Sequence, residues 1–244
     1  MRTYAIGDIH GHLDLLRAAH ARIRADRAVT GDHAAPVIHV GDLVDRGPDS
    51  PGVIDFLRAG IAAGEPWVVL KGNHDRMFTL FLKTPPQRDP KLRADLGWLH
   101  PRLGGGPTLA GYGIHAPTDR PEAAVHRDAL VAVPQAHRDF LESLPLMHRR
   151  GDVVFVHAGI RPGVALEEQT EDDLIWIRHD FLDDARDHGV LVVHGHTAVE
   201  RATHHGNRLN IDSSAAYGGP VSAVVIEGRS AWLLGPDGRE ALLP

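Results

Sequence analysis

Short apolar runs recur along the chain, and each one ends in glycine and polar residues. They lie at 3–8, 36–42, 67–73, 152–159 and 190–196. Their hydrophobicity is continuous rather than alternating, which is typical of strands that are covered on both faces. We therefore expect five buried β-strands.

The segments between the first three strands have helical periodicity. In residues 13–28, Leu13, Leu16 and Ile23 recur at helical spacing, and residues 50–64 form a second such segment. Strands that alternate with helices predict an α/β fold with a largely parallel sheet and helices on its faces.

The rest of the chain has a different character. Residues 207–212, 220–228 and 230–235 read as strands joined by short glycine-rich turns, and we expect them to be antiparallel. Residues 84–150 are irregular, and we expect loops and short helices over one end of the sheet. Because no repeat or clear linker is present, we expect residues 1–244 to form a single domain.

Composition narrows the functional classes. The chain has 244 residues, 43% of them apolar, and a net charge of −6 without a basic tract, which excludes disorder and argues against nucleic-acid binding. The absence of cysteine excludes disulfides, thiolate metal ligands and a cysteine nucleophile. No room for a signal peptide precedes the first strand, and no apolar run is long enough for a membrane span, so we expect a cytoplasmic protein.

A polar cluster follows each of the five strands. The clusters are GDIHG at 7–11, GDLVDRG at 41–47, GNHD at 72–75, HAG at 157–159 and HGHT at 194–197. In open α/β sheets the carboxyl ends of the strands meet at one crevice, where ligands bind. The five clusters are therefore expected to converge.

The converging side chains are aspartate, asparagine and histidine, a set of oxygen and nitrogen donors that suits Mn²⁺, Fe or Zn²⁺. They are too many for one closed ion but fit two metals that share a carboxylate. A metal would also offset the cost of desolvating Asp8 and His10. Each cluster alone could be an ordinary turn or a buried core histidine, but that reading needs five coincidences at five strand ends.

The ordered motifs resemble the metallophosphoesterase superfamily. They look most like the bacterial branch of the phosphoprotein phosphatases, which includes the symmetrical diadenosine-tetraphosphate hydrolases. LIWIR at 174–178 and NIDSSAAYGG at 210–219 are similar to later motifs of this branch. The resemblance covers nearly the whole chain. It implies a calcineurin-like four-layer α/β/β/α sandwich with a dinuclear metal site at the carboxyl ends of the strands.

The resemblance also implies the metal ligands. Two divalent ions are expected, with Mn²⁺ preferred and Fe, Zn²⁺ or Co²⁺ as alternatives. The six ligands it implies are Asp8 and His10 for the first metal, Asp42 as the bridge, and Asn73, His157 and His196 for the second. His194 lies two residues before His196 and could be confused with it. His12 is expected to lie outside the ligand set or to face solvent.

By the same resemblance, a metal-activated hydroxide attacks phosphorus. His74 matches the general acid that protonates the leaving group, and Asp45 matches the carboxylate that orients it. Arg46 and Arg178 match the arginines that contact phosphate, although Arg178 could instead form a salt bridge on a helix surface. Arg76 and Arg161 follow metal-site motifs, and we assign them no role.

The motifs divide on the substrate. Asp45 is typical of phosphoprotein phosphatases, because the diadenosine-tetraphosphate hydrolases have alanine there, whereas GNHD and HAGI look more like those hydrolases. We favour a metal-dependent phosphomonoesterase of the bacterial serine/threonine protein phosphatase type, acting on a phosphorylated protein or a small phosphate ester. The alternative is a symmetrical dinucleoside polyphosphate hydrolase. In either case residues 84–150 are expected to carry specificity.

A third hypothesis is a metal-binding module that has lost its activity. Such a module would be expected to lack the bridging aspartate or the general acid. Asp42 and His74 are both present.

Overall fold

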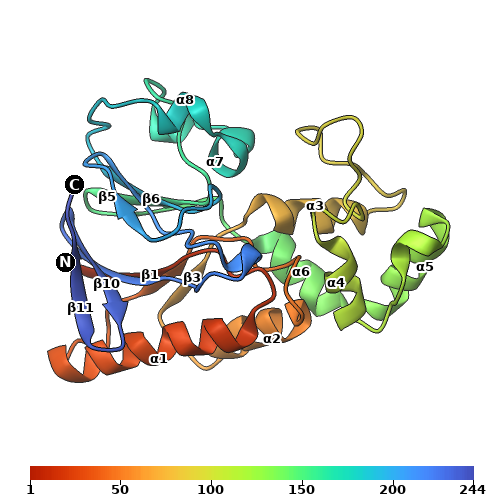
Figure 1. Cartoon of the computed structure of the whole chain (residues 1–244), viewed down its shortest axis with the longest axis horizontal. Helices are drawn as coiled ribbons and strands as arrows, with labels where there is room; N and C mark the ends of the chain where they lie inside the picture. Colours follow the sequence, from red (N-terminus) through yellow and green to blue (C-terminus); the bar gives the residue numbers. More distant parts are fainter.

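The computed structural model describes residues 1–244 and has two β-sheets packed face to face, with helices on both outer faces (Figure 1). The strand order is β11-β10-β9-β1-β2-β3 in the first sheet and β4-β5-β6-β8-β7 in the second. In chain order the main elements are β1 (Arg2–Ile6), α1 (Leu13–Thr30), β2 (Val37–His39), α2 (Ser50–Ala62), β3 (Trp67–Val69), α3 (Asn73–Phe81), α4 (Gly105–Gly111), α5 (Glu122–Ala132), α6 (Gln135–Ser143), β4 (Met147–Arg150), β5 (Val153–Val156), α7 (Glu171–Trp176), α8 (His179–Leu182), β6 (Leu191–His194), β7 (Thr203–His204), β8 (Arg208–Asn210), β9 (Ala223–Glu227), β10 (Ser230–Gly235) and β11 (Gly238–Leu242).

Three apolar clusters separate the four layers. In β1, Tyr4 and Ile6 pack with residues of α1 and α2, whereas Ala5 between them packs toward the second sheet. In β5, Phe155 faces the first sheet and Val154 faces the layer of α7 and α8. Alternate residues of each strand thus enter different cores, which explains the continuous hydrophobicity of these runs. The expected α/β/β/α sandwich is confirmed.

All five strands expected at the polar clusters are present, although each is shorter than its apolar run. The central strands β1, β2 and β3 are parallel, as expected, while β9, β10 and β11 form an antiparallel extension. The expectation that residues 207–212 form an antiparallel strand was wrong. Strand β8 within it joins the second sheet, parallel to β6 and antiparallel only to β7. The hydrophobic pattern of a segment indicates that a strand is buried, but it does not indicate which other strands pair with it.

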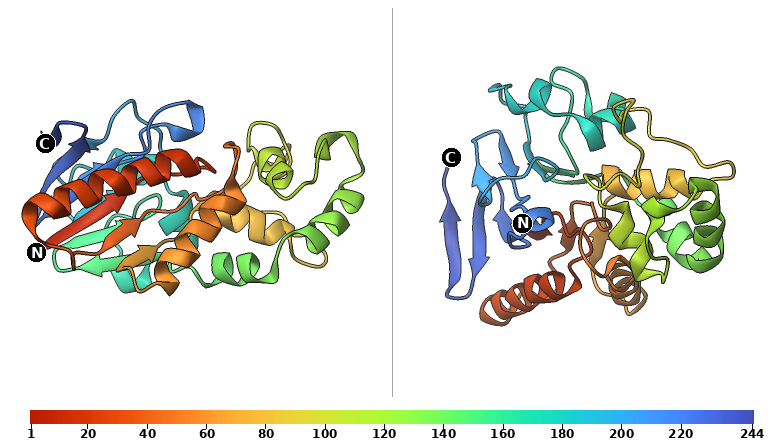
Figure 2. Two further views of the ribbon diagram at one scale, coloured as in Figure 1. Left: turned by 90° about the horizontal axis from the view of Figure 1, so that it is seen from below. Right: turned by 45° about the vertical axis from the view of Figure 1, so that its right-hand side comes forward.

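Residues 84–150 contain loops and the short helices α4, α5 and α6, as expected, and also the strand β4, which was not expected. Figure 1 shows α3 to α6 beyond the carboxyl ends of the parallel strands β1, β2 and β3, and Figure 2 shows the same helices grouped away from α1. Trp98, Leu109 and Leu141 of this segment belong to the same apolar cluster as α1 and α2. No helix of the structure is long and apolar enough to cross a membrane.

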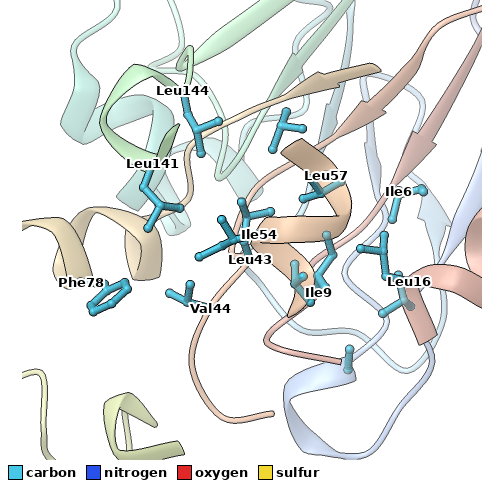
Figure 3. Packing of buried hydrophobic residues seen from close by; sticks show 14 of the residues in the cluster. Ile6, Ile9, Leu16, Leu43, Val44, Ile54, Leu57, Phe78, Leu141 and Leu144 are labelled. Carbon is cyan, nitrogen blue, oxygen red and sulfur yellow. The ribbon is translucent and has the colours of Figure 1, made fainter. Parts of the chain in front are cut away.

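In the loops after β1 and β2, apolar side chains that pack into the core alternate with polar side chains that belong to the site. Ile9, Leu43 and Val44 are fully buried in the apolar cluster shown in Figure 3. Each lies beside a polar residue of the motifs, and its burial in this cluster directs the polar neighbour away from the cluster, toward the site. The core therefore fixes the direction of the polar side chains.

A pair of buried histidines lies away from these loops. His20 of α1 and His39 of β2 place their Nε2 atoms 3.0 Å apart, and His39 Nδ1 donates to the Val68 carbonyl at 3.2 Å. His39 Nε2 is therefore an acceptor, and His20 Nε2–H donates to it. Burial lowers the pKa of His20 to about 2 and that of His39 to about 4.

We expect this pair to make stability depend on pH. Because both pKa values lie below the unfolded value of about 6.5, the unfolded chain binds protons that the folded chain does not. The contribution is complete well above pH 6.5 and is lost as the pH falls below that value, down to about 4 for His39 and about 2 for His20. Replacing His20→Gln keeps an N–H donor without a titrating group. It should reduce the slope of unfolding free energy against pH by about 1 kcal/mol per pH unit between pH 6 and 5.

Urea unfolding in EDTA at several pH values measures that slope. The exposed His179→Gln is the matched control and should leave it unchanged. An equal slope in His20→Gln and in the wild type would contradict the expectation.

Candidate metal centre

The predicted site residues lie together where the carboxyl ends of the two sheets meet. All of them except Asp8, Asp45 and His157 line a cavity of about 250 Å³, whose walls include residues that follow β2, β3, β6 and β8. Asn73 and His74 enter it from the first turn of α3. Most of the predicted set is buried, namely Asp8, His10, Asp42, Asp45, Asn73, His74, His157 and His196.

The first group of donors follows β1 and β2. His10 Nδ1 donates to the Val44 carbonyl at 3.0 Å, which leaves its Nε2 lone pair directed at Asp42 Oδ2, 3.4 Å away. His10, Asp42 and His74 place one ligand atom each within 4.8 Å of one another. Asp8 lies slightly apart from this group. Its Oδ2 accepts the His196 backbone N–H at 3.0 Å, and its buried Oδ1 has no partner.

The second group joins the two sheets. His157 Nδ1 donates to the Val40 carbonyl at 2.9 Å, and burial lowers the pKa of this imidazole, so its Nε2 carries a lone pair. That lone pair lies 2.9 Å from Asn73 Oδ1 and 3.3 Å from Asp42 Oδ1. His196 Nδ1 lies 2.9 Å from the same Asn73 oxygen. Asp42 is common to both groups, as expected of a bridging ligand.

The backbone is strained at these residues. The non-glycine residues with positive φ are His10, Asp42, Asp45, Arg46, His196, Ser214 and Ala116, and the first five are predicted site residues. Each such conformation costs about 1–3 kcal/mol and persists only where the surroundings impose it. This backbone strain is a separate observation from the sequence motifs, and it points to the same site.

Carboxylates crowd the site. Burial, together with the charges of Asp212 and Asp42, raises the pKa of Asp8 well above its usual range. Burial and the Asp42 charge also raise the pKa of Asp212 to about 6. For Asp42 itself burial opposes ionisation, but the surrounding imidazoles, with His157 the strongest, hold its pKa below the usual range.

These contacts fit divalent cations. The lone pairs of His157 Nε2 and Asn73 Oδ1 face each other across 2.9 Å, and Asp8 Oδ1 and His196 Nε2 are buried without partners. A cation would satisfy acceptors that otherwise repel. The carbonyls that accept from His10 and His157 are the kind of partner that fixes the tautomer of a metal-binding histidine.

Glycine allows the backbone to approach the ligands. A Cβ on Gly72 would lie 2.1 Å from Asp42 Oδ1, and one on Gly195 would lie 1.9 Å from Asp8 Oδ1. The glycines of GNHD and HGHT therefore leave the space in which these two carboxylates lie.

His74 and Asp45 form a buried pair. His74 Nδ1 lies 2.7 Å from Asp45 Oδ2, and the other nitrogen, Nε2, accepts from Arg46 Nη2 at 3.1 Å at the cavity wall. The carboxylate therefore holds one ring nitrogen while the other faces the space where a ligand would bind.

Of the four arginines considered, two reach the cavity. Arg46 also donates from Nη1 to His10 Nε2 at 3.1 Å, and its guanidinium stacks on the Tyr217 ring at 5.1 Å. Arg178 is exposed at the cavity rim, and its nearest polar contact is Thr197 Oγ1 at 3.5 Å. It forms no ion pair, unlike Arg76 and Arg161.

Those two arginines have structural contacts. Arg76 makes a two-pronged ion pair with Asp89 at 2.8 and 3.0 Å. Arg161 donates to Asp173 Oδ1 at 2.9 Å from Nε. Neither lines the cavity.

The two uncertain histidines lie outside the donor groups. His194 is buried edge-on against Phe181, with ring centroids 5.2 Å apart, and its Nδ1 contacts the Gly195 carbonyl. His12 occupies the N-cap position of α1 and is partly exposed.

Sequence reasoning missed several residues of the site. Asp212 lines the cavity, and its position within NIDSS was a signal, since it lies two residues after the end of the buried strand β8. Asp75 of GNHD accepts the backbone N–H groups of Gly72 and Leu43, which joins the start of α3 to the loop after β2. Trp98 and Thr108, which contact Asp45, come from the irregular segment and carried no signal.

Comparison with curated proteins finds short matches. Serine/threonine-protein phosphatase 1 of Salmonella typhimurium is 36% identical over 31% of this chain and 30% of its own length. The symmetrical bis(5'-nucleosyl)-tetraphosphatase of Thioalkalivibrio sulfidiphilus is 37% identical over 31% of this chain and 25% of its own. The chain therefore spans less than a third of these relatives in the matched region.

Comparison with solved structures and with family patterns covers nearly the whole chain. The cold-active protein-tyrosine phosphatase of a psychrophilic Shewanella species has the same fold, with a TM-score of 0.62 over 99% of this chain and 80% of that one at 19% identity. Residues 1–226 match the calcineurin-like phosphoesterase family. With the metal-binding motifs at the ends of both sheets, this match shows that the chain belongs to the calcineurin-like phosphoesterase family.

Proposed function

We propose that this chain is a metal-dependent phosphomonoesterase of the bacterial serine/threonine protein phosphatase type. The observation that carries the proposal is the 2.7 Å contact between Asp45 and His74 at the wall of the metal cavity. That contact holds a proton donor where the leaving group of an ester would lie, and the family's dinucleotide hydrolases have alanine in place of Asp45.

Two divalent ions are the proposed cofactors. Asp8, His10 and Asp42 would hold the first, and Asp42 with Asn73, His157 and His196 would hold the second. Bound there, the ions supply polarisation of a phosphoryl oxygen and activate water for attack on phosphorus. Mn²⁺ is the ion that we expect to serve best, given the mixed oxygen and nitrogen donors.

The two arginines bind the phosphate. Arg46 and Arg178 approach the cavity from different elements, and Arg178 has no carboxylate partner to neutralise it. Guanidinium groups match the geometry of two phosphate oxygens and stabilise the charge that develops on them. Binding by both would orient phosphorus toward the metal ligands.

When phosphate is bound, the Arg46 guanidinium contacts the phosphate instead of His74 Nε2, and that nitrogen can carry a proton. His74 then donates this proton to the leaving oxygen. Asp45 fixes Nδ1, so the Nε2 atom keeps its direction toward the cavity. This geometry is that of a general acid held in place by a carboxylate.

The organic part of the ester has room beside the cavity. A second hollow of about 530 Å³ shares Arg46 and Tyr217 with the metal cavity and is otherwise lined by residues such as Arg102 and Pro107. Tyr217 is 71% exposed there. The size and the cationic lining also suit a nucleotide, so this hollow favours the alternative function, a symmetrical dinucleoside polyphosphate hydrolase.

The metal content tests the first part of the proposal. Protein equilibrated with Mn²⁺ should hold about two ions per chain, and EDTA should abolish phosphate release. Asp42→Asn should lower occupancy of both sites, because Asp42 belongs to both groups, whereas Asp8→Asn should mainly affect one. The control His12→Gln should keep both ions. Elemental analysis that finds one ion at saturation would exclude the dinuclear site.

The substrate comparison separates the two functions. We expect a higher kcat/KM for p-nitrophenyl phosphate and for phosphoserine peptides than for diadenosine tetraphosphate, because Asp45 and His74 are arranged for an alcohol leaving group. A preference of about a hundredfold for the dinucleotide, with ADP as the product, would instead establish the alternative.

Leaving-group basicity tests His74. A general acid contributes about 10²–10⁴-fold, and it matters most when the leaving group is a poor one. His74→Asn should therefore lose about that factor in kcat on phosphoserine peptides, and clearly less on p-nitrophenyl phosphate. Its metal content should stay at the wild-type level, which separates it from His157→Ala. Equal losses on both esters with the metals retained would show that His74 is not the proton donor.

A further inference from the structure

The carboxylate of Asp45 is hydrogen-bonded on both oxygens, and it is fully buried. Oδ2 accepts from Trp98 Nε1 at 2.9 Å in addition to its contact with His74. Oδ1 accepts from Thr108 Oγ1 at 2.8 Å. Two of the three side chains that hold this carboxylate thus come from residues 84–150.

Thr108 bonds Asp45 twice. Its hydroxyl donates to Asp45 Oδ1 and accepts the backbone N–H of the same aspartate, at 2.8 Å in each case. Asp45 has a positive φ of 73°. The Thr108 hydroxyl therefore contacts both the strained backbone, whose N–H also lies 3.3 Å from Ser50 Oγ, and the side chain that extends from it.

Trp98 is held by the helix that carries His74. Its ring stacks on Phe78 at 5.0 Å and packs on Phe81 at 4.7 Å, both residues of α3. His74 lies in the first turn of the same helix. The indole N–H and the imidazole therefore reach the Asp45 carboxylate from one rigid support.

The same segment reaches the neighbouring arginine. The backbone N–H of Arg46 donates to the Gly104 carbonyl at 3.1 Å, and a Cβ on Gly104 would lie 2.5 Å from that nitrogen. Residues 98–108 thus contact two successive residues of the GDLVDRG motif through hydrogen bonds.

A carboxylate held only by His74 could turn about its Cβ–Cγ bond and carry the imidazole with it. The N–H of Trp98 and the hydroxyl of Thr108 remove this freedom, because each fixes one oxygen. Hydrogen bonds to charged groups are the strong ones in proteins.

We propose that Trp98 and Thr108 are positioning residues that hold Asp45, and through it His74, in the orientation for proton donation. Residues 84–150 then contribute to catalysis as well as to substrate choice. The inference rests on the proposed function of His74.

The experiment uses full-length, metal-loaded protein and two variants that change little in shape. Trp98→Phe keeps an aromatic ring on Phe78 and removes the N–H, and Thr108→Val removes the hydroxyl. Loss of one hydrogen bond to a charged group should reduce kcat on a phosphoserine peptide about tenfold. On p-nitrophenyl phosphate the reduction should stay below about twofold, because nitrophenolate needs little protonation. KM and metal content should not change.

Two controls remove the same groups elsewhere. Trp67→Phe deletes a buried indole N–H that has no hydrogen-bond partner, and Thr79→Val deletes a hydroxyl that donates within α3. Both should leave the ratio of the two kcat values unchanged. A merely structural effect of the test variants would lower both rates together and leave that ratio at the wild-type value.

Combination with His74→Asn separates this inference from the proposed function. If His74 acts through this arrangement, Trp98→Phe should cause no further loss of the ratio in a His74→Asn background. If His74→Asn changes the ratio but neither Trp98→Phe nor Thr108→Val does, the positioning role is overturned and the proton donor stands. If His74→Asn leaves the ratio unchanged, the proton-donor assignment fails, and the positioning role fails with it.

Discussion

The crowding of acceptor atoms where the two sheets meet is the interaction on which the site depends. Asn73 Oδ1 and His157 Nε2 face each other at 2.9 Å, beside the Asp42 carboxylate. Such a contact is unfavourable without a cation. Packing holds it in place: the side chains between the polar residues, such as Ile9 and Leu43, are fully buried in the core. Their burial offsets the strain of the left-handed backbone around them.

The proposed ligands come from both sheets, so bound metals would have a second effect. Asp8 and Asp42 follow strands of the first sheet, and His157 and His196 follow strands of the second. Any ion that binds this set favours the state in which the sheets are packed together, and it stabilises the fold by mass action. The apolar cluster between the sheets includes Phe155 and Ala5. This cluster and the candidate metal centre at the strand ends would thus support the same arrangement.

Much of this arrangement could be predicted from the sequence, because strand ends in α/β sheets converge regardless of detail. The five clusters therefore predicted a set of candidate donors, and the structure brings these side chains together. Pairing partners were harder, since the apolar run of β8 does not reveal that it lies beside β6. Trp98 and Thr108 were beyond reach for a similar reason. Their contacts with Asp45 depend on how residues 84–150 fold back onto the loop after β2, and no local sequence pattern predicts that arrangement.

The ion pair of Arg76 with Asp89 affects how the substrate specificity of this protein could be changed. Asp89 also accepts from the Trp176 indole at 3.3 Å, and Trp176 lies edge-on to His196. The segment that begins near Asp89 is thus tied to α3 and α7 before it reaches the substrate side of the cavity. Exchange of this segment between relatives would remove its contacts with α3 and α7 along with any contacts it makes with the substrate. New specificity is therefore more accessible through single changes at the exposed rim than through transplanted loops.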